Sequence, residues 1–294
     1  MKRSKVVTLV GAFALALSVG AAQAAPYTYE GFDYTAGEQV GWSTPVHDGG
    51  TGWAAAWDGA TQGAPIVADS GLTYTDGGGN ALVTTGKGLL FDDGPDDAGR
   101  TLASGISAGS EAWFSVLLDG AAFGVDSGLA TEWVLYDSSG AEDDTSLQVW
   151  SRDRGYGGMW EIALSANGDA DYFRDLNGDS YPVPTGTILL VAHIDNEKTT
   201  AGQVTADVWV NPSDITGSDL GTPFASLTVA GDGSQTYDRL YIHNSGGWGE
   251  LDVTYDEIRF GDTLADVTPV PEPLTVALMG VGGAIVALRR RRKA

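Results

Sequence analysis

The middle of the chain, residues 25–269, consists of short runs in which apolar and polar residues alternate. In 203–211, apolar residues occupy every second position: Val204, Ala206, Val208 and Val210. A period of two is typical of a β-strand that buries one face, so the opposite face, with Trp209, meets solvent or a ligand. Residues 238–243 repeat the pattern. We expect a fold built on strands, because no run of ten residues places its apolar residues at the spacing of an amphipathic helix.

Two runs are apolar on both faces, 111–118 (EAWFSVLL) and 187–194 (TILLVAHI). In the first run, Trp113 and Leu117 point one way, and the residues that point the other way are Phe114, Val116 and Leu118. A strand with two apolar faces belongs in a sheet that is covered on both sides. These runs are therefore expected to be central strands.

The last run, 251–261, changes phase along its length. Its apolar positions are odd-numbered at first and then even-numbered: Val253, Tyr255, Ile258 and Phe260. One face can hold all four residues only if the strand contains an extra residue, which predicts a β-bulge near Asp256-Glu257. Residues 262–269 are expected to be a short tether.

About thirteen such runs lie between Gly, Asp and Pro residues. The others include 27–34, 72–75, 81–84, 88–91, 132–137, 146–151 and 159–164. This pattern favours an all-β fold, an antiparallel jelly-roll sandwich, in one domain over 25–269. Because the chain holds no Cys, the fold rests on its core, and thiolate catalysis and Cys-ligated metal sites are excluded. Three tryptophans are expected to close the sandwich edge: Trp42, Trp53 and Trp57.

Three segments carry a resemblance to a fold family: YEGFDY (29–34), ADVWVNP (206–212) and DEIRFGDTLADV (256–267). Together they resemble the laminin-G-like, concanavalin A-like jelly rolls of bacterial surface proteins. The resemblance implies a jelly-roll domain that is displayed on a bacterial surface.

The N-terminus has the three parts of a secretory signal peptide. They are a basic start, a hydrophobic stretch and a small-residue cleavage site: Lys2, Arg3 and Lys5, then 6–19, then Ala22-Gln23-Ala24. Residues 1–24 are therefore expected to be removed on export, which leaves a mature chain that starts at Ala25.

The C-terminus, 270–294, also has three parts: Pro271-Glu272-Pro273, the uncharged run Leu274–Leu288 and the basic cluster 289–293. The prolines keep the first part extended. As a helix the uncharged run is about 22 Å long, which is short for the roughly 30 Å hydrocarbon core of a bilayer, and the basic cluster stays on the cytoplasmic side.

This order of parts resembles the PEP-CTERM sorting signal of Gram-negative bacteria. The resemblance implies that an exosortase-type enzyme cleaves near the triplet and passes the protein to the cell surface or the extracellular matrix. The alternative is a plain tail anchor, in which Leu274–Leu288 stays in the membrane.

The charge is unevenly distributed. Eight of the 16 Lys and Arg residues lie in the two ends, whereas all but one of the 39 acidic residues lie between them, so 25–269 has a net charge near −30. Such a surface repels nucleic acid and anionic lipid, which are therefore poor partners. It favours solubility outside the cell and attracts cations.

Two motifs suggest enzymes but are incomplete. Glu250 and Asp252 match the start of the laminarinase-type pattern, in which two carboxylates on one strand act as nucleophile and acid. The second Glu of that pattern is absent, because Thr254 and Tyr255 stand there. The stretch 105–109 fits G-x-S-x-G, but a strand is expected after it where a nucleophile elbow needs a helix. We therefore expect no catalytic residues.

Calcium is the one cofactor that the sequence suggests. Asp175, Asn177 and Asp179 place oxygen ligands at alternate positions, as at the start of an EF-hand loop. A complete EF-hand is excluded, because Ser180 and Gly186 stand where the loop needs Gly and Glu. Residues 167–171 hold a similar run, and an acidic hairpin tip is the alternative for both. The three histidines have no zinc-type spacing: His47, His193 and His243.

A ligand face is predicted from four residues on polar strand faces: Trp209, Arg239, Tyr241 and His243. Aromatic rings stack on sugar rings, and Arg donates paired hydrogen bonds. The sequence therefore favours an exported, non-enzymatic surface protein that binds polysaccharide or protein. The alternatives are a carbohydrate-active enzyme on the same fold, either a glycoside hydrolase or a polysaccharide lyase, and a structural matrix component without a ligand.

Overall fold

The computed structural model describes residues 27–41, 46–59, 63–91, 96–107, 109–119, 130–138, 146–152, 159–166, 169–174, 186–196, 202–217, 220–231, 236–245 and 252–270. Several predicted features lie outside these residues. They are the signal peptide, the sorting triplet, the run Leu274–Leu288, and the candidate calcium ligands Asp175, Asn177 and Asp179. Within the described residues, no helix has the length and apolar character needed to cross a bilayer.

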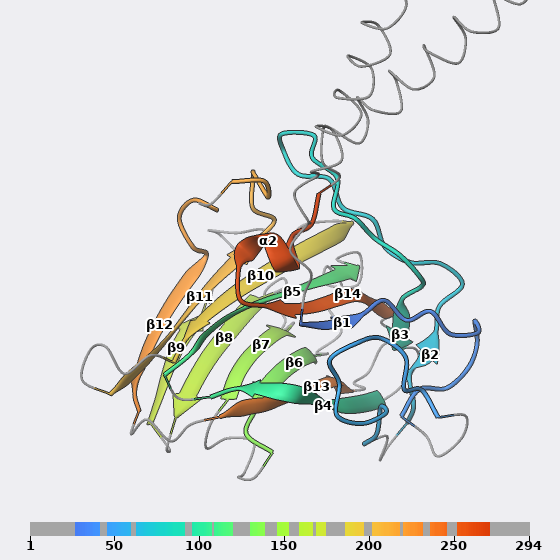
Figure 1. Ribbon diagram of the computed structural model, residues 1–294, viewed down its shortest axis with the longest axis horizontal. Coiled ribbons are helices and arrows are strands. Elements are labelled where there is room, and N and C mark those ends of the chain that lie inside the picture. Colours follow the sequence, from blue (N-terminus) through green and yellow to red (C-terminus); the bar gives the residue numbers. More distant parts are fainter. Residues whose placement is uncertain are drawn as a thin grey trace, which may run out of the picture. The chain divides into compact units, whose positions relative to one another are not determined.

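Two antiparallel sheets form the fold (Figure 1). The eight-stranded sheet runs β12 (Ala225–Ala230), β11 (Gln203–Val210), β10 (Thr187–Asp195), β5 (Glu111–Asp119), β14 (Val253–Gly261), β3 (Leu89–Phe91) and β2 (Ile66–Val67), and β1 (Thr28–Glu30) pairs with β14. The six-stranded sheet runs β4 (Asp96–Ile106), β13 (Tyr237–Ser245), β6 (Ala130–Tyr136), β7 (Ser146–Arg152), β8 (Met159–Ala166) and β9 (Asp169–Arg174). The prediction of an all-β, antiparallel jelly-roll sandwich is confirmed.

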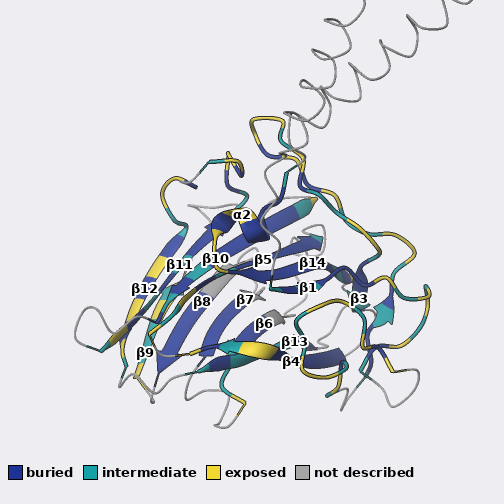
Figure 2. Ribbon diagram, viewed as in Figure 1, coloured by how far each residue is buried: buried dark blue, intermediate teal, exposed yellow. Residues whose placement is uncertain are grey.

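The central strands have the two apolar faces that the sequence predicts. On β5, Phe114, Val116 and Leu118 pack in the main core between the sheets. Leu117 joins a second apolar cluster on the outer face of the eight-stranded sheet, together with Leu189 of β10. Both strands are buried along most of their length (Figure 2).

A folded segment covers that outer face and corrects the prediction of a tether over 262–269. It contains the short helix α2 (Leu264–Val267), and the backbone N–H of Thr268 donates to the Leu264 carbonyl at 2.9 Å. Val267 is fully buried, and Val270 packs against the second cluster. Apolar residues of 262–270 therefore pack onto the outer face of the sheet.

The predicted β-bulge is confirmed on β14. The pairing of β14 with β5 shifts register between Asp256 and Arg259, and Glu257 has a φ of 54°, in the left-handed region. The strands predicted at 72–75 and 81–84 are wrong, because these segments contribute only an isolated bridge between Thr75 and Ala81.

A buried ion pair joins β4 to β1, and the same arginine holds the connection that contains Trp53 and Trp57. Arg100 pairs with Glu30, and both side chains are 1% exposed. The Arg100 Nε donates to the Ala55 carbonyl at 2.8 Å, and its guanidinium lies 4.8 Å from the Trp53 ring. Trp57 is buried in the main core. Trp53 and Trp57 thus close the sandwich edge as expected, and Trp42 lies outside the described residues.

Candidate functional site

Strand β13 carries three of the four residues predicted to form a ligand face. Leu240 and Ile242 are fully buried in the main core. Because side chains alternate along a strand, Arg239, Tyr241 and His243 lie on the outer face of the six-stranded sheet.

Arg239 reaches across the neighbouring strand to a loop residue. It forms an ion pair with Asp58, and its Nη1 donates to Thr101 Oγ1 at 3.1 Å. The guanidinium lies directly over Gly99, where a Cβ atom would stand 2.6 Å from Nη2. Burial disfavours the charged form of Arg239, but the hydrogen bond and charge of Asp58 outweigh it, so the pKa of Arg239 is raised.

Tyr241 and His243 form an aromatic pair beside a buried carboxylate. Their rings are 6.1 Å apart and parallel within 19°. The Tyr241 hydroxyl donates to Asp97 Oδ2 at 2.7 Å, and Asp97 is 1% exposed. We call Asp58, Asp97, Arg239, Tyr241 and His243 the β13 cluster.

Backbone register extends the β13 cluster across the whole sheet. His243 pairs with Asp97 on β4 and with Glu132 on β6. The same row continues through Trp150 on β7, Glu161 on β8 and Arg174 on β9. We call this line of six residues the transverse row. The sequence gives no signal for it, because the six residues are separated by loops of unequal length.

Trp209 lies apart from the other three predicted residues. It belongs to β11 of the opposite sheet and is 8% exposed. Its ring stacks on Trp113 at 5.7 Å, and its Nε1 donates to the Gly221 carbonyl at 3.0 Å. The structure therefore places Trp209 in the second apolar cluster, not on a surface shared with β13.

The other two histidines contact carboxylates. His193 lies on the outer face of the eight-stranded sheet, where its ring stacks on Trp113 at 4.4 Å and its Nε2 lies 3.3 Å from Glu111 Oε2. His47 is 3% exposed, and its Nε2 lies 3.4 Å from Glu38 Oε2. The two rings are on separate elements, as the absence of zinc-type spacing implies.

Asp169 and Asp171, the described acids of the run 167–171, link β9 to β12 of the other sheet. Asp171 Oδ2 accepts the backbone N–H of Thr228 at 2.9 Å, and Asp169 Oδ2 accepts that of Ala230 at 3.4 Å. These carboxylates bind edge donors of β12 instead of facing a common point. Among the described residues, no group of three or more His, Cys, Asp or Glu side chains is arranged to hold a metal ion. The calcium prediction at Asp175, Asn177 and Asp179 stays a prediction.

The enzyme-like motifs have different outcomes. The G-x-S-x-G stretch starts in β4 and is followed by β5, so a strand stands where a nucleophile elbow has a helix. Of the laminarinase-like pair, Glu250 is outside the described residues, and Asp252 directly precedes β14.

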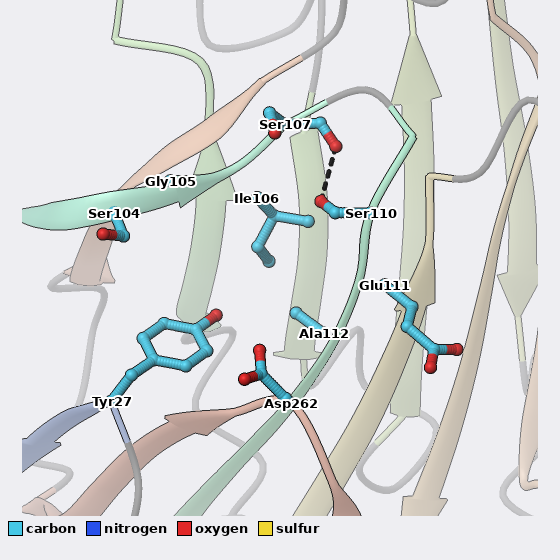
Figure 3. A pocket seen from close by; sticks show the side chains of 9 residues that line it. All are labelled: Tyr27, Ser104, Gly105, Ile106, Ser107, Ser110, Glu111, Ala112 and Asp262. Carbon is cyan, nitrogen blue, oxygen red and sulfur yellow. Dashed lines mark hydrogen bonds between the residues drawn. The ribbon is translucent and has the colours of Figure 1, made fainter.

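A pocket of about 300 Å³ opens at one end of the sandwich (Figure 3). It is lined by Tyr27, Ser104, Gly105, Ile106, Ser107, Ser110, Glu111, Ala112 and Asp262. The Ser110 hydroxyl donates to the Ser107 carbonyl at 2.6 Å. Burial raises the pKa of Tyr27, and Asp262 and Asp266 raise it further. The Tyr27 hydroxyl therefore stays protonated and available as a donor.

The bulge on β14 places charged side chains in the interior. Asp256 and Glu257 are fully buried, and Arg259 is 3% exposed and paired with Glu257. Asp256 accepts the backbone N–H groups of Leu72 and Glu257, each at 2.7 Å. Burial and the charge of Glu257 nevertheless raise the pKa of Asp256 to about 8.

No protein-family model matches the sequence, and no curated protein is similar to it in sequence. Solved structures share the backbone arrangement. The potassium-bound carbohydrate recognition domain of Emp46p is 12% identical, over 62% of this chain and 86% of that one, with a TM-score of 0.40.

Two enzymes are also among the similar structures. An endo-1,3-beta-glucanase from Streptomyces sioyaensis is 10% identical over 82% of this chain and 97% of its own, with a TM-score of 0.44. The alginate lyase vAL-1 from Chlorella virus is 9% identical over 72% and 93%, with a TM-score of 0.40. At these identities the similarity concerns the fold alone.

Proposed function

We propose that this chain is an exported cell-surface or matrix protein of a Gram-negative bacterium, and that its jelly roll binds a neutral polysaccharide without cleaving it. The proposed contact surface is the outer face of the six-stranded sheet. The observation that carries the proposal is the β13 cluster, where two parallel aromatic rings stand beside an arginine and two carboxylates.

The chemistry of the β13 cluster fits a sugar polymer. Tyr241 and His243 offer ring surfaces for the C–H faces of pyranose rings. The exposed carboxylate of Asp58 adds an acceptor for sugar hydroxyls, and buried Asp97 holds the Tyr241 hydroxyl in place. The transverse row crosses six strands, about 24 Å at about 4.8 Å per strand. A surface of this length suits an extended chain better than a single small molecule.

The charge of the protein favours a neutral polymer. A net charge near −30 over 25–269 repels uronate chains. Within the cluster, the guanidinium of Arg239 is already paired with Asp58, so it does not supply an uncompensated positive charge for a uronate carboxylate.

The same contacts argue against lyase chemistry. Elimination from a uronate needs a group that neutralises the carboxylate and a base that removes a proton. Arg239 is engaged by Asp58, and the Tyr241 hydroxyl donates to Asp97. These contacts support binding rather than turnover.

Export and sorting rest on the two ends of the sequence. The signal peptide at 1–24 and the triplet Pro271-Glu272-Pro273 give the protein a route through an exosortase-type partner. Deletion of the triplet tests this part of the proposal. We expect the protein to be retained in the membrane fraction, and unchanged release and anchoring would contradict it.

Affinity electrophoresis tests the binding surface. The protein should be retarded by laminarin or galactomannan and not by alginate, and a Tyr241→Ala/His243→Ala variant should bind at least tenfold more weakly. Thr228→Ala, exposed on the opposite sheet, is the matched control. Failure of both neutral polymers to retard the protein, or equal retardation of the double variant, would overturn the proposal.

The transverse row supports a second candidate, hydrolysis of a neutral glycan. Register places Glu132 and Glu161 two strands apart, about 10 Å between their backbones. Register places both residues on one face of the sheet, and inverting glycosidases act through a pair of carboxyl groups. Release of reducing ends from laminarin, lost in both Glu132→Gln and Glu161→Gln, would favour this candidate over binding alone.

A further inference from the structure

The pocket in Figure 3 is formed where four separate parts of the fold meet. Tyr27 precedes β1, Ser104 to Ile106 end β4, Ala112 begins β5 and Asp262 follows β14. No residue of the β13 cluster lines it. The pocket is therefore distinct from the polysaccharide surface proposed above.

The lining combines an apolar base with oxygen atoms at the rim. Ile106 and Ala112 are 2% and 3% exposed. In Figure 3 the Tyr27 hydroxyl and the Asp262 carboxylate project into the same space. The Glu111 carboxylate points away from it, because its Oε2 contacts His193 Nε2 at 3.3 Å.

This lining excludes several ligand classes. Among the described residues that line the pocket there is no Lys, Arg or His, so these residues offer no cationic side chain to pair with an anion. Of the two acidic side chains among the described lining residues, Glu111 points away and Asp262 points inward (Figure 3), whereas calcium takes about 6–8 oxygen ligands with several charges. A purely apolar molecule would leave the carboxylate and three serine hydroxyls without new partners.

A neutral sugar unit fits the lining better than the ligand classes excluded above. Its C–H face suits the apolar base and the Tyr27 ring, and its hydroxyls can donate to Asp262 and exchange hydrogen bonds with Ser104, Ser107 and Tyr27. A volume of about 300 Å³ is at the lower end of the roughly 300–1,000 Å³ range of small-molecule pockets, which suits one pyranose ring rather than a chain. We infer that this pocket binds one neutral sugar unit, either a free monosaccharide or a chain end.

Saturation-transfer NMR and calorimetry with the full-length protein in detergent test the inference. The probes are D-glucose, D-galactose, D-mannose and N-acetyl-D-glucosamine. At least one should bind, and both Asp262→Asn and Tyr27→Phe should weaken it at least tenfold. Asp69→Asn, an exposed acid away from the pocket, is the control, and equal urea midpoints show that each variant is folded.

The two sugar sites can be told apart. The Tyr241→Ala/His243→Ala variant should bind the monosaccharide as the original protein does. If none of the four sugars binds at tens of millimolar, or if binding survives both pocket substitutions, the inference is wrong. Loss of monosaccharide binding in the β13 variant alone would assign the sugar to the other surface and also overturn it.

Discussion

Asp256 should make the stability of this protein fall as the pH rises toward 8. The carboxyl is fully buried at the β14 bulge, and burial, with the charge of Glu257, raises its pKa from 3.8 to about 8. The folded state therefore binds a proton that the unfolded state releases above pH 4. Stability is greatest below the unfolded pKa and is lost as the pH rises to the folded pKa.

The size of the effect follows from the shift in pKa. Each pKa unit corresponds to about 1.4 kcal/mol, so a shift of roughly four units is worth on the order of 5 kcal/mol between pH 4 and pH 8. The pKa of about 8 already reflects the backbone N–H groups of Leu72 and Glu257, which stabilise the anion. Asp256→Asn removes the titration while keeping one acceptor oxygen.

Urea unfolding followed by tryptophan fluorescence at intervals from pH 5 to pH 8.5 measures the effect. The original protein should lose unfolding free energy across this range, and Asp256→Asn should lose distinctly less. Asp69→Asn, exposed on a loop, should behave like the original protein. A flat profile in the original protein, or the same slope in Asp256→Asn, would refute the reasoning.

Three further substitutions test the packing and the ligand surface. Glu30→Gln leaves the Arg100 charge buried without its carboxylate and should cost about 3–5 kcal/mol in urea unfolding; a loss near zero would contradict the role of this pair. Leu190→Ala in the main core should cost about 2–5 kcal/mol, and a midpoint equal to that of the original protein would place this residue outside the core. Gly99→Leu should displace Arg239 and weaken polysaccharide retardation while the circular dichroism spectrum stays unchanged. Gly77→Ala is its control, and equal retardation of both variants would show that Arg239 does not shape the surface.

The sequence predicts the features of the fold that follow from the alternation of apolar and polar residues and from its phase along a strand. The two faces of β5 and β10 and the bulge at Asp256-Glu257 follow from side-chain period alone. The strands predicted at 72–75 and 81–84 are wrong, because loop residues that pack on a sheet can alternate between apolar and polar without pairing with a neighbouring strand. β12 was missed, although its burial alternates residue by residue, because its run is short and bordered by Gly.

The candidate site depends on distances that alternation does not encode. The sequence places Arg239, Tyr241 and His243 on one face, since all three belong to one strand. It does not reveal Asp97, because the acidic run 92–97 is typical of a turn, whereas β4 begins at Asp96. It does not reveal Asp58 either, because that residue reaches β4 only through an isolated bridge to Gly99. Trp209 shares only its chemistry with the other three predicted residues. The strand order shows that it belongs to the eight-stranded sheet, whereas β13 belongs to the six-stranded sheet.

Residues 262–270 and the proposed ligand surface lie on opposite sides of the sandwich. Val83 N–H donates to the Pro269 carbonyl at 2.8 Å, and the Thr268 hydroxyl donates to the Ile215 carbonyl at 3.0 Å. These contacts hold the chain against the outer face of the eight-stranded sheet up to the residue before Pro271. The β13 cluster is on the outer face of the other sheet. Residues 262–270 therefore pack on the sheet opposite to the β13 cluster and do not cover it.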